Sequence, residues 1–370
     1  MLIKKVKYSY NDVMIVPSVL SSIEHRSECK PSYEDGYLPI FTAPMSTVVN
    51  EDNFDIFEEN HIHAILPRNI DFETRIKYSL NNKWAAFSLE EFKNFFCDET
   101  LSKNYINIKK KALIDVANGH MKKLYSIAKK AKRIYGDSLE LMVGNIANPE
   151  TYLEAYKANV DYIRISIGTG AGCITSSNVS IHYGIASLID EIKELRNSFA
   201  NEHCINIESM TKIVADGGIR NYSDVIKALA LGADYVMIGG LLSQTVESAA
   251  KSFIKDENNN IIDFNPTKDK ILSNNKFIVN ENEYNGVLYK IFYGMASKEG
   301  QIDLNGCKDK TSEGIKKLLP CSYTLSKWVD NMESYLKSAM SYTNTNNIND
   351  FKRNVDLILI SDKTFVSINK

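Results

Sequence analysis

The sequence predicts an α/β protein whose fold class is a TIM (β/α)8 barrel. Eight short, largely apolar runs recur along the chain, and most are separated by segments that are compatible with helices. Apolar strands of this length are typical of parallel sheets that are covered on both faces. Glycines and polar residues directly follow many of these runs, and the carboxyl ends of barrel strands carry the active site in this fold.

The eight expected strands are residues 38–43, 62–66, 84–87, 112–116, 141–144, 162–165, 212–216 and 235–239. Segments 149–156 and 222–229 have the pattern of amphipathic helices. We expect Asn148 to cap the first of them, with Pro149 at its first helical position.

Residues 251–290 interrupt this order with polar stretches such as 256–260. We expect a long hairpin or loop that is inserted after the eighth strand. Residues 1–370 are therefore expected to form a single catalytic barrel domain with this insertion and a C-terminal extension.

The composition is that of a soluble globular protein, with 44% hydrophobic residues, 24% charged residues and a net charge of −2. This charge gives no reason to expect nucleic acid or a membrane as a partner. The basic run 109–111 is expected to be a solvated strand entry. No segment has the pattern of a signal peptide or of a span of ~18 apolar residues. The six cysteines lack CxxC spacing, which argues against a zinc site and favours the reducing cytoplasm.

Cys173 ends a glycine-rich turn that follows the sixth expected strand. Glycines at 168, 170 and 172 allow a tight turn that can approach a ligand. A thiol at this place is well presented for attack, and the hydroxyl of Thr175 is near enough in sequence to move a proton. A small buried hydrophobic cysteine is the other interpretation.

Paired glycines close the last two strands, as Gly217 and Gly218 and as Gly239 and Gly240. Their backbone N–H groups can hold a phosphate at the end of a TIM barrel. Asp216 can accept hydrogen bonds from ribose hydroxyls, although a helix cap would also explain it.

The chain resembles the IMP dehydrogenase/GMP reductase family over nearly its whole length. The resemblance is carried by short motifs in family order: residues 11–13, 25–28, 43–47, the Cys173 loop, 216–218, 239–240, 292–295 and 312–314. It implies a TIM barrel that assembles as a homotetramer. It also implies that Cys173 attacks C2 of a purine nucleotide to form a thioimidate.

Three features resemble GMP reductase. Residues 115–119 and 292–295 are similar to the sequence motifs of the reductases, and residues 296–310 contain neither Arg nor Tyr. Dehydrogenases carry an Arg-Tyr pair there that activates water, and they commonly carry tandem regulatory domains that this chain lacks. The resemblance thus implies NADPH-dependent conversion of GMP to IMP and ammonia. IMP dehydrogenase-like oxidation and a non-catalytic nucleotide-binding barrel remain the alternatives.

The resemblance also implies roles for individual residues. Cys173, Thr175 and Glu313 are implied as catalytic, although Glu313 could be a plain surface carboxylate. The implied nucleotide-binding residues are Asp216, Gly217, Gly218, Gly239, Gly240, Gly294, Met295, Ala296, Ser312 and Gly314. The implied cofactor-binding residues are His25, Arg26, Asp115, Val116, Ala117, Met295, Ser338 and Ser341. His25 and Arg26 could equally be a surface basic pair.

Carbonyls of Gly168, Gly170 and Cys173 correspond to positions that hold a monovalent cation, usually K⁺, in relatives. Four residues depart from the family pattern. Ala171 replaces a phosphate-binding Ser, Ser176 replaces an Arg, Ser46 replaces an Asp, and Pro67 lies near the place of a Lys, with Arg68 adjacent. These changes leave the base and the sugar of the substrate open.

Overall fold

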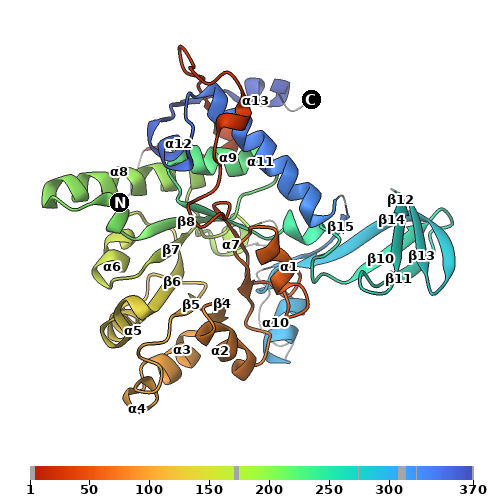
Figure 1. Cartoon of the computed structure of the whole chain (residues 1–370), viewed down its shortest axis with the longest axis horizontal. Coiled ribbons are helices and arrows are strands. Elements are labelled where there is room, and N and C mark those ends of the chain that lie inside the picture. Colours follow the sequence, from red (N-terminus) through yellow and green to blue (C-terminus); the bar gives the residue numbers. More distant parts are fainter. Residues whose placement is uncertain (1–4, 171–174, 274, 307–313, 322, 369–370) are drawn as a thin grey trace.

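Eight parallel strands form a barrel in the computed structural model, which describes residues 5–170, 175–273, 275–306, 314–321 and 323–368 (Figure 1). The strands run in the order β2-β9-β8-β7-β6-β5-β4-β3, and a parallel bridge between Phe41 and His63 closes the ring. The predicted TIM barrel and all eight of its strands are confirmed. The strands are β2 Ile40–Thr42, β3 Ile65–Leu66, β4 Trp84–Phe87, β5 Lys110–Asp115, β6 Leu139–Ile146, β7 Tyr162–Ile165, β8 Lys212–Asp216 and β9 Tyr235–Ile238.

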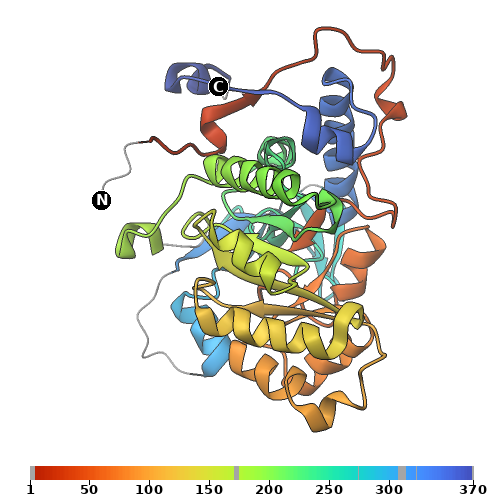
Figure 2. The ribbon, with the colours of Figure 1, turned by 90° about the vertical axis from the view of Figure 1, so that its left-hand side faces the viewer.

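Helices connect these strands and cover the outside of the sheet (Figure 2). They are α1 Phe54–Glu59, α2 Phe72–Leu80, α3 Leu89–Phe96, α4 Glu99–Ser102, α5 Lys122–Tyr135, α6 Thr151–Lys157, α7 Thr175–Val179, α8 Ile185–His203 and α9 Tyr222–Leu231. Helix α6 begins two residues later than the sequence predicted. Asn148 and Pro149 form a turn before it, in which Asn148 Oδ1 accepts the N–H of Glu150 at 3.0 Å. Within the described residues, no helix combines the length and the apolar character that crossing a bilayer requires.

Alternation along each strand divides the core into two layers. Leu113, Tyr162 and Val214 point into the barrel, where they pack with Phe41 and Trp84. Their neighbours along the strands, such as Ile114 and Ile163, point outward and pack under the helices. The parity of a residue along its strand therefore decides which layer it enters.

Lys110 corrects the expectation of a solvated strand entry. It is only 1% exposed and faces outward to α5, where its Nζ lies 4.2 Å from the centre of the Tyr135 ring. Burial lowers the pKa of Lys110 to about 8. The sequence of three lysines does not show that Lys110 points to the same side of β5 as Ala112 and Ile114, which are buried under the helices.

The segment after β9 forms an antiparallel sheet that lies beside the barrel (Figure 1). Its strands are β10 Ser252–Asp256, β11 Ile261–Phe264, β12 Lys270–Ser273, β13 Lys276–Val279, β14 Asn282–Tyr293 and β15 Lys316–Pro320. One face buries Ile254, Phe264, Phe277 and Leu288 in a small core of their own. The expected hairpin or loop at 251–290 is thus more ordered than its polar turns suggested, because apolar residues alternate between those turns.

The C-terminal extension packs back onto the barrel. Helix α11 (Leu325–Tyr342) buries Trp328, Met332 and Leu336. After α12 (Ile348–Asn354), strand β16 (Leu357–Leu359) pairs antiparallel with β1 (Val13–Ile15) near the other end of the chain. A last helix, α13, spans Asp362–Ile368.

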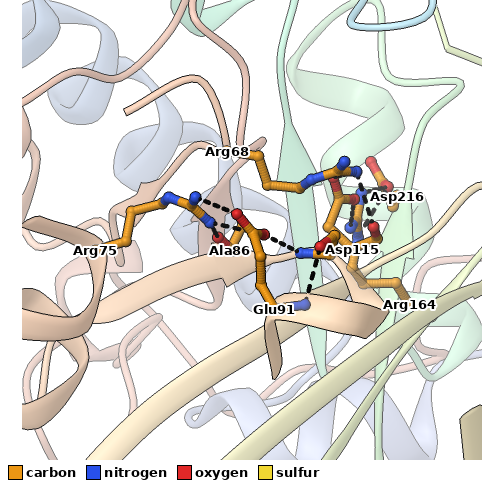
Figure 3. Close-up of polar contacts among 8 residues, drawn as sticks. Arg68, Arg75, Ala86, Glu91, Asp115, Arg164 and Asp216 are labelled. Carbon is orange, nitrogen blue, oxygen red and sulfur yellow. Dashed lines mark hydrogen bonds and ion pairs between the residues drawn. The ribbon is translucent and has the colours of Figure 1, made fainter. Parts of the chain in front are cut away.

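A buried arginine fixes α2 to α3 (Figure 3). Arg75 is 2% exposed and donates to the carbonyls of Ile70 at 2.8 Å and Ala86 at 2.9 Å, and to Glu91 Oε1 at 2.6 Å. Burial alone would raise the pKa of Glu91, but Arg75 and the N–H of Ser88 lower it to about 2.

This pair makes stability depend on pH. A carboxylate whose pKa is lower in the folded state stabilises the fold above its unfolded pKa, and this contribution is lost as the pH falls through the folded value. We expect the Glu91→Gln variant to be less stable than the wild type, and the difference in the free energy of unfolding to be largest above pH ~4.5, where unfolded Glu is ionised. The deficit should shrink as the pH falls toward about 2. Urea unfolding across this range checks it, with exposed Glu73→Gln on α2 as control; a deficit that is constant with pH would contradict it.

Candidate active site

Three charged residues form the last layer of the barrel interior. Asp115, Arg164 and Asp216 each lie two residues after an inward-facing core residue, on β5, β7 and β8. Because strand residues two apart share a face, all three side chains enter the barrel at its carboxyl end. Such charges can be buried there only if they compensate one another.

Arg164 joins the two carboxylates (Figure 3). Its Nη1 donates to Asp115 Oδ1 at 2.6 Å, and its Nη2 and Nε donate to Asp216 Oδ2 at 2.8 and 3.2 Å. Burial opposes the charge of Arg164, but Asp216 and Asp115 raise its pKa above the ordinary value. Arg68 approaches from the rim, with Nη1 3.1 Å from the Asp115 carbonyl and 3.6 Å from its carboxylate.

A glycine opens the path between Arg164 and Asp115. Gly144 on β6 lies in register with Asp115 on one side and with Arg164 on the other. It has the inward parity of Met142, so any larger residue would project into this layer. A Cβ at Gly144 would lie 2.5 Å from the Arg164 carbonyl oxygen. Glycine therefore lets the guanidinium reach across β6.

The hydrogen bonds that hold Asp216 all reach the same carboxylate oxygen. Arg164 and the Nδ2 of Asn145, at 2.7 Å, all donate to Oδ2. In the part of the chain that the structure describes, no hydrogen bond reaches Oδ1. The helix-cap interpretation does not apply, since Asn221 caps the following helix α9. The arrangement leaves Oδ1 free to accept from a ligand hydroxyl.

A cavity of about 240 Å³ lies over this layer, at the carboxyl ends of the strands. It brings together most of the residues that sequence reasoning selected for the nucleotide. These are Asp216, Gly217, Gly218, Gly239, Gly240, Gly294, Met295 and Ala296, with Asp115, Arg164 and Gly170 also in the lining. Gly314 is buried but outside this lining. Cys173, Ser312 and Glu313 lie outside the described residues.

The glycines in this cavity bring backbone close to the ligand space. Gly217 has a φ of +110°, and a Cβ there would lie 2.5 Å from Thr169 Oγ1. A Cβ at Gly239 would meet Met45 Sδ at 3.0 Å. Among the described residues, the N–H groups of Gly217 and Gly240 have no acceptor, whereas Gly218 donates to the Thr169 carbonyl at 3.1 Å. Such open N–H groups suit a phosphate.

A carboxylate from α10 (Lys298–Asn305) contacts residue 46, which is Ser here and Asp in the family pattern. Asp303 Oδ2 accepts from Ser46 Oγ and from Tyr293 OH, both at 2.7 Å. Burial and the bond to Asp303 raise the pKa of Tyr293 to about 12. The pair of hydroxyls thus fastens α10 to the rim of the cavity beside Met295.

The residues expected to bind the cofactor fall into two groups. Asp115 and Met295 line the cavity, and Val116 and Ala117 follow β5 directly at the same rim. The other group lies on α11 and the segment packed against it, where Arg26 Nη1 is 3.4 Å from Ser338 Oγ and the Ser341 carbonyl accepts from Ser21. His25, Arg26, Ser338 and Ser341 are not in the cavity lining. The described residues of this chain therefore do not place the two groups in one cavity lining.

In the loop that was expected to bind a cation, the Gly168 carbonyl accepts a hydrogen bond from a nearby side chain. Ser176 Oγ donates to the Gly168 carbonyl at 2.5 Å and lies 3.1 Å from His182 Nδ1. The carbonyl that would face K⁺ is thus already paired with the residue that replaces an Arg. Cys173, whose carbonyl is the third one expected at the cation, lies outside the described residues, so the K⁺ site stays a prediction. K⁺ has no part in the steps proposed below.

Comparison with known proteins agrees with this geometry. Residues 105–261 match the model of the IMP dehydrogenase / GMP reductase domain. The chain is therefore similar to this family. It is 26% identical to the GMP reductase of Staphylococcus carnosus over 97% of this chain and 98% of that protein. The GMP reductases of Bacillus subtilis and Bacillus licheniformis are 26% and 27% identical, each with 97% of both chains covered.

Sequence reasoning did not select Arg164, Arg68 or Asn145. A signal for Arg164 was present, because a charged residue inside the apolar strand 162–165 requires buried partners of opposite charge. The i, i+2 spacing after Leu113, Tyr162 and Val214 would have placed the three charges in one layer. Arg68 lies on a turn, and Asn145 lies at a register shift in the pairing of β6 with β7. The sequence does not determine the direction of either side chain.

Removing the central cation, Arg164, should lower the stability of the protein substantially. Arg164→Met leaves two buried carboxylates without their partner, and we expect a loss of about 3–5 kcal/mol in the free energy of unfolding. Urea unfolding measures it, with Arg133→Met on the exposed face of α5 as a matched control. Equal losses in the two variants would contradict the role assigned to Arg164.

Restoring the usual carboxylate at position 46 should loosen α10. Ser46→Asp would face Asp303 across the present 2.7 Å contact, and two like charges repel. We expect amide hydrogen exchange in residues 298–305 to become about fivefold faster, as for a loss of ~1 kcal/mol. The exchanged pair Ser46→Asp/Asp303→Ser should recover slow exchange; no recovery would mean that this contact does not hold α10.

Proposed function

We propose that this chain is an NADPH-dependent GMP reductase that converts GMP to IMP and ammonia through a thioimidate on Cys173. The observation that carries the proposal is the cavity at the carboxyl ends of β8 and β9. There a fixed carboxylate, Asp216, keeps Oδ1 free beside the open N–H groups of Gly217 and Gly240. A ribose 5′-phosphate has the hydroxyls and the anionic group that such a pair of sites accepts.

The nucleotide is oriented by this pair. Asp216 Oδ1 accepts from the ribose hydroxyls, while the N–H groups of Gly217 and Gly240 donate to the phosphate. Arg164 and Asn145 keep Asp216 from turning, so its free oxygen is ready before binding. Gly168, Thr169 and Gly170 lie at this rim, and the proposed nucleophile, Cys173, follows three residues after Gly170 in the sequence.

The covalent step uses Cys173 and Thr175 together with Glu313, which lies much later in the chain. The Cys173 thiolate adds to C2 of the purine, and the departing amine takes a proton through Thr175 and Glu313. Protonation is required because ammonia is a good leaving group and its anion is not. When bound, NADPH supplies the hydride that replaces the sulfur at C2. The thiolate is released as the C–S bond breaks, which leaves IMP.

The residues at the rim fit the nicotinamide cofactor. Arg68 Nε is buried beside Asp115 and has no acceptor among the described residues, so it is available to a polar group of a ligand. Asp115 and Met295 line the same cavity. We propose that His25, Arg26, Ser338 and Ser341 hold the distal part of a cofactor bound to a neighbouring protomer of a homotetramer, since they are not in the cavity lining of this chain. The proposed place of the enzyme is the cytoplasm.

We expect GMP and NADPH together, but neither alone, to give IMP and ammonia with loss of the NADPH absorbance band. Cys173→Ala should lower kcat by about a thousandfold or more, because the covalent route is lost, whereas Cys204→Ala, at an exposed position, should retain activity. Intact-protein mass spectrometry should find a nucleotide adduct that Cys173→Ala lacks.

Absence of NADPH consumption with both GMP and dGMP would reject the reductase. Formation of NADH from IMP and NAD would instead identify an IMP dehydrogenase. Binding of GMP without turnover or adduct would identify a non-catalytic barrel.

A further inference from the structure

A second cavity, of about 540 Å³, lies at the opposite end of the barrel from the candidate active site. Its wall is made by α8, by α12 and by the starts of β8 and β9. Lys212 begins β8 at this end, and Asp216 ends the same strand in the layer that it forms with Asp115 and Arg164. At ~3.3 Å per residue, the two sites are separated by about 13 Å of strand. A ligand here would therefore not occupy the catalytic cavity.

The lining of this cavity is strongly basic, although the whole chain has a net charge of −2. Five cationic side chains face two carboxylates, Asp234 and Glu208. The cationic residues are Lys193, Arg196, Lys212, Lys352 and Arg353. Arg353 is paired with Glu208, and one carboxylate, Asp234, serves two of the remaining cations. The cavity thus keeps an excess of positive charge.

A buried network holds the back of the cavity in place. Asp234 Oδ2 accepts from Arg196 Nη1 at 2.6 Å and from the N–H of Ile213 at 2.8 Å, while its Oδ1 accepts from Lys352 Nζ at 2.9 Å. Lys352 also donates to the hydroxyl of Tyr33 at 2.8 Å. Burial alone would raise the pKa of Asp234, but Lys352 and Arg196 lower it well below its ordinary value. Two cations are therefore fixed on one wall before any ligand arrives.

Two further lysines in the lining have no carboxylate within ion-pair distance among the described residues. They are Lys193 on α8, one turn before Arg196, and Lys212, whose Nζ lies 5.7 and 5.9 Å from the ring centres of Tyr162 and Tyr235. Burial and the nearby Arg196 lower the pKa of Lys193, although Asp190 and Asp356 raise it. An anion in the cavity would relieve this crowding of positive charge.

We propose that this cavity binds a phosphorylated small molecule that carries two or more negative charges. The phosphate groups contact Lys193 and Lys212 in front of the Arg196 and Lys352 wall. Amides of Asn197, Asn201 and Asn206 and the apolar surface of Ile205 lie in the same lining and leave room for an organic part. The volume lies in the range of small-molecule sites, roughly 300–1,000 Å³. This inference does not depend on the proposed reductase activity.

The test is isothermal titration calorimetry of the full chain with two probes, inorganic pyrophosphate and ATP. We expect both to bind the wild type, and ATP to bind more tightly if the organic part is recognised. The double variant Lys193→Glu/Lys212→Glu should bind at least about tenfold more weakly, because two attractive charges become repulsive. The control Lys122→Glu/Lys129→Glu makes the same charge change at exposed positions of α5 and should bind as the wild type does.

A second measurement uses unaltered protein, so it does not depend on the folding of a variant. Pyrophosphate should protect Lys193 and Lys212, but not Lys122 and Lys129, from acetylation followed by mass spectrometry. No heat with either probe, or no protection, would overturn the proposal. So would affinities that are equal in the wild type and the cavity variant, since binding would then belong to the catalytic cavity.

Discussion

The candidate active site depends on one buried cation between two carboxylates. Arg164 is 6% exposed and lies within hydrogen-bond distance of Asp115 and Asp216 together. Each charge would be costly to bury alone, so the three can form the top layer of the barrel only as a set. This constraint also requires Gly144, because a side chain there would block the reach of Arg164 across β6. The layer in turn fixes the direction in which Asp216 offers its free oxygen.

The barrel could be predicted from the sequence because its signals are local and repeated. Eight apolar runs and the glycines that follow them determined the strands, and the carboxyl ends of those strands correctly located the cavity. The prediction failed where a residue's environment comes from distant elements. Lys110 was expected in solvent but is covered by α5, and the apolar alternation in 251–290 was obscured by polar turns. Helix α6 begins late because Pro149 lies in a turn that Asn148 closes.

The site itself was predicted in part. Glycines and Asp216 were selected because their types suit a phosphate and a ribose. The structure places them in one cavity, while their binding role stays a prediction. The residues that support them were missed because their side-chain directions depend on the finished fold. Arg68 lies on a turn, and Asn145 lies at a register shift in β6. The surroundings of Ser46 also depend on a distant part of the chain. Its hydroxyl donates to Asp303, more than two hundred residues later in the chain, and the local sequence gives no sign of this contact. The contact places a negative charge near Met295 and fixes α10.

We infer that the layer of Asp115, Arg164 and Asp216 presents Asp216 and the open N–H groups of the glycines to a purine nucleotide. A crystal structure of the protein with GMP tests it most directly. We expect the ribose hydroxyls to donate to Asp216 Oδ1 while Oδ2 stays on Arg164, and the phosphate to lie against the N–H groups of Gly217 and Gly240. A nucleotide bound elsewhere, or an Asp216 that has left Arg164 to reach it, would overturn this inference.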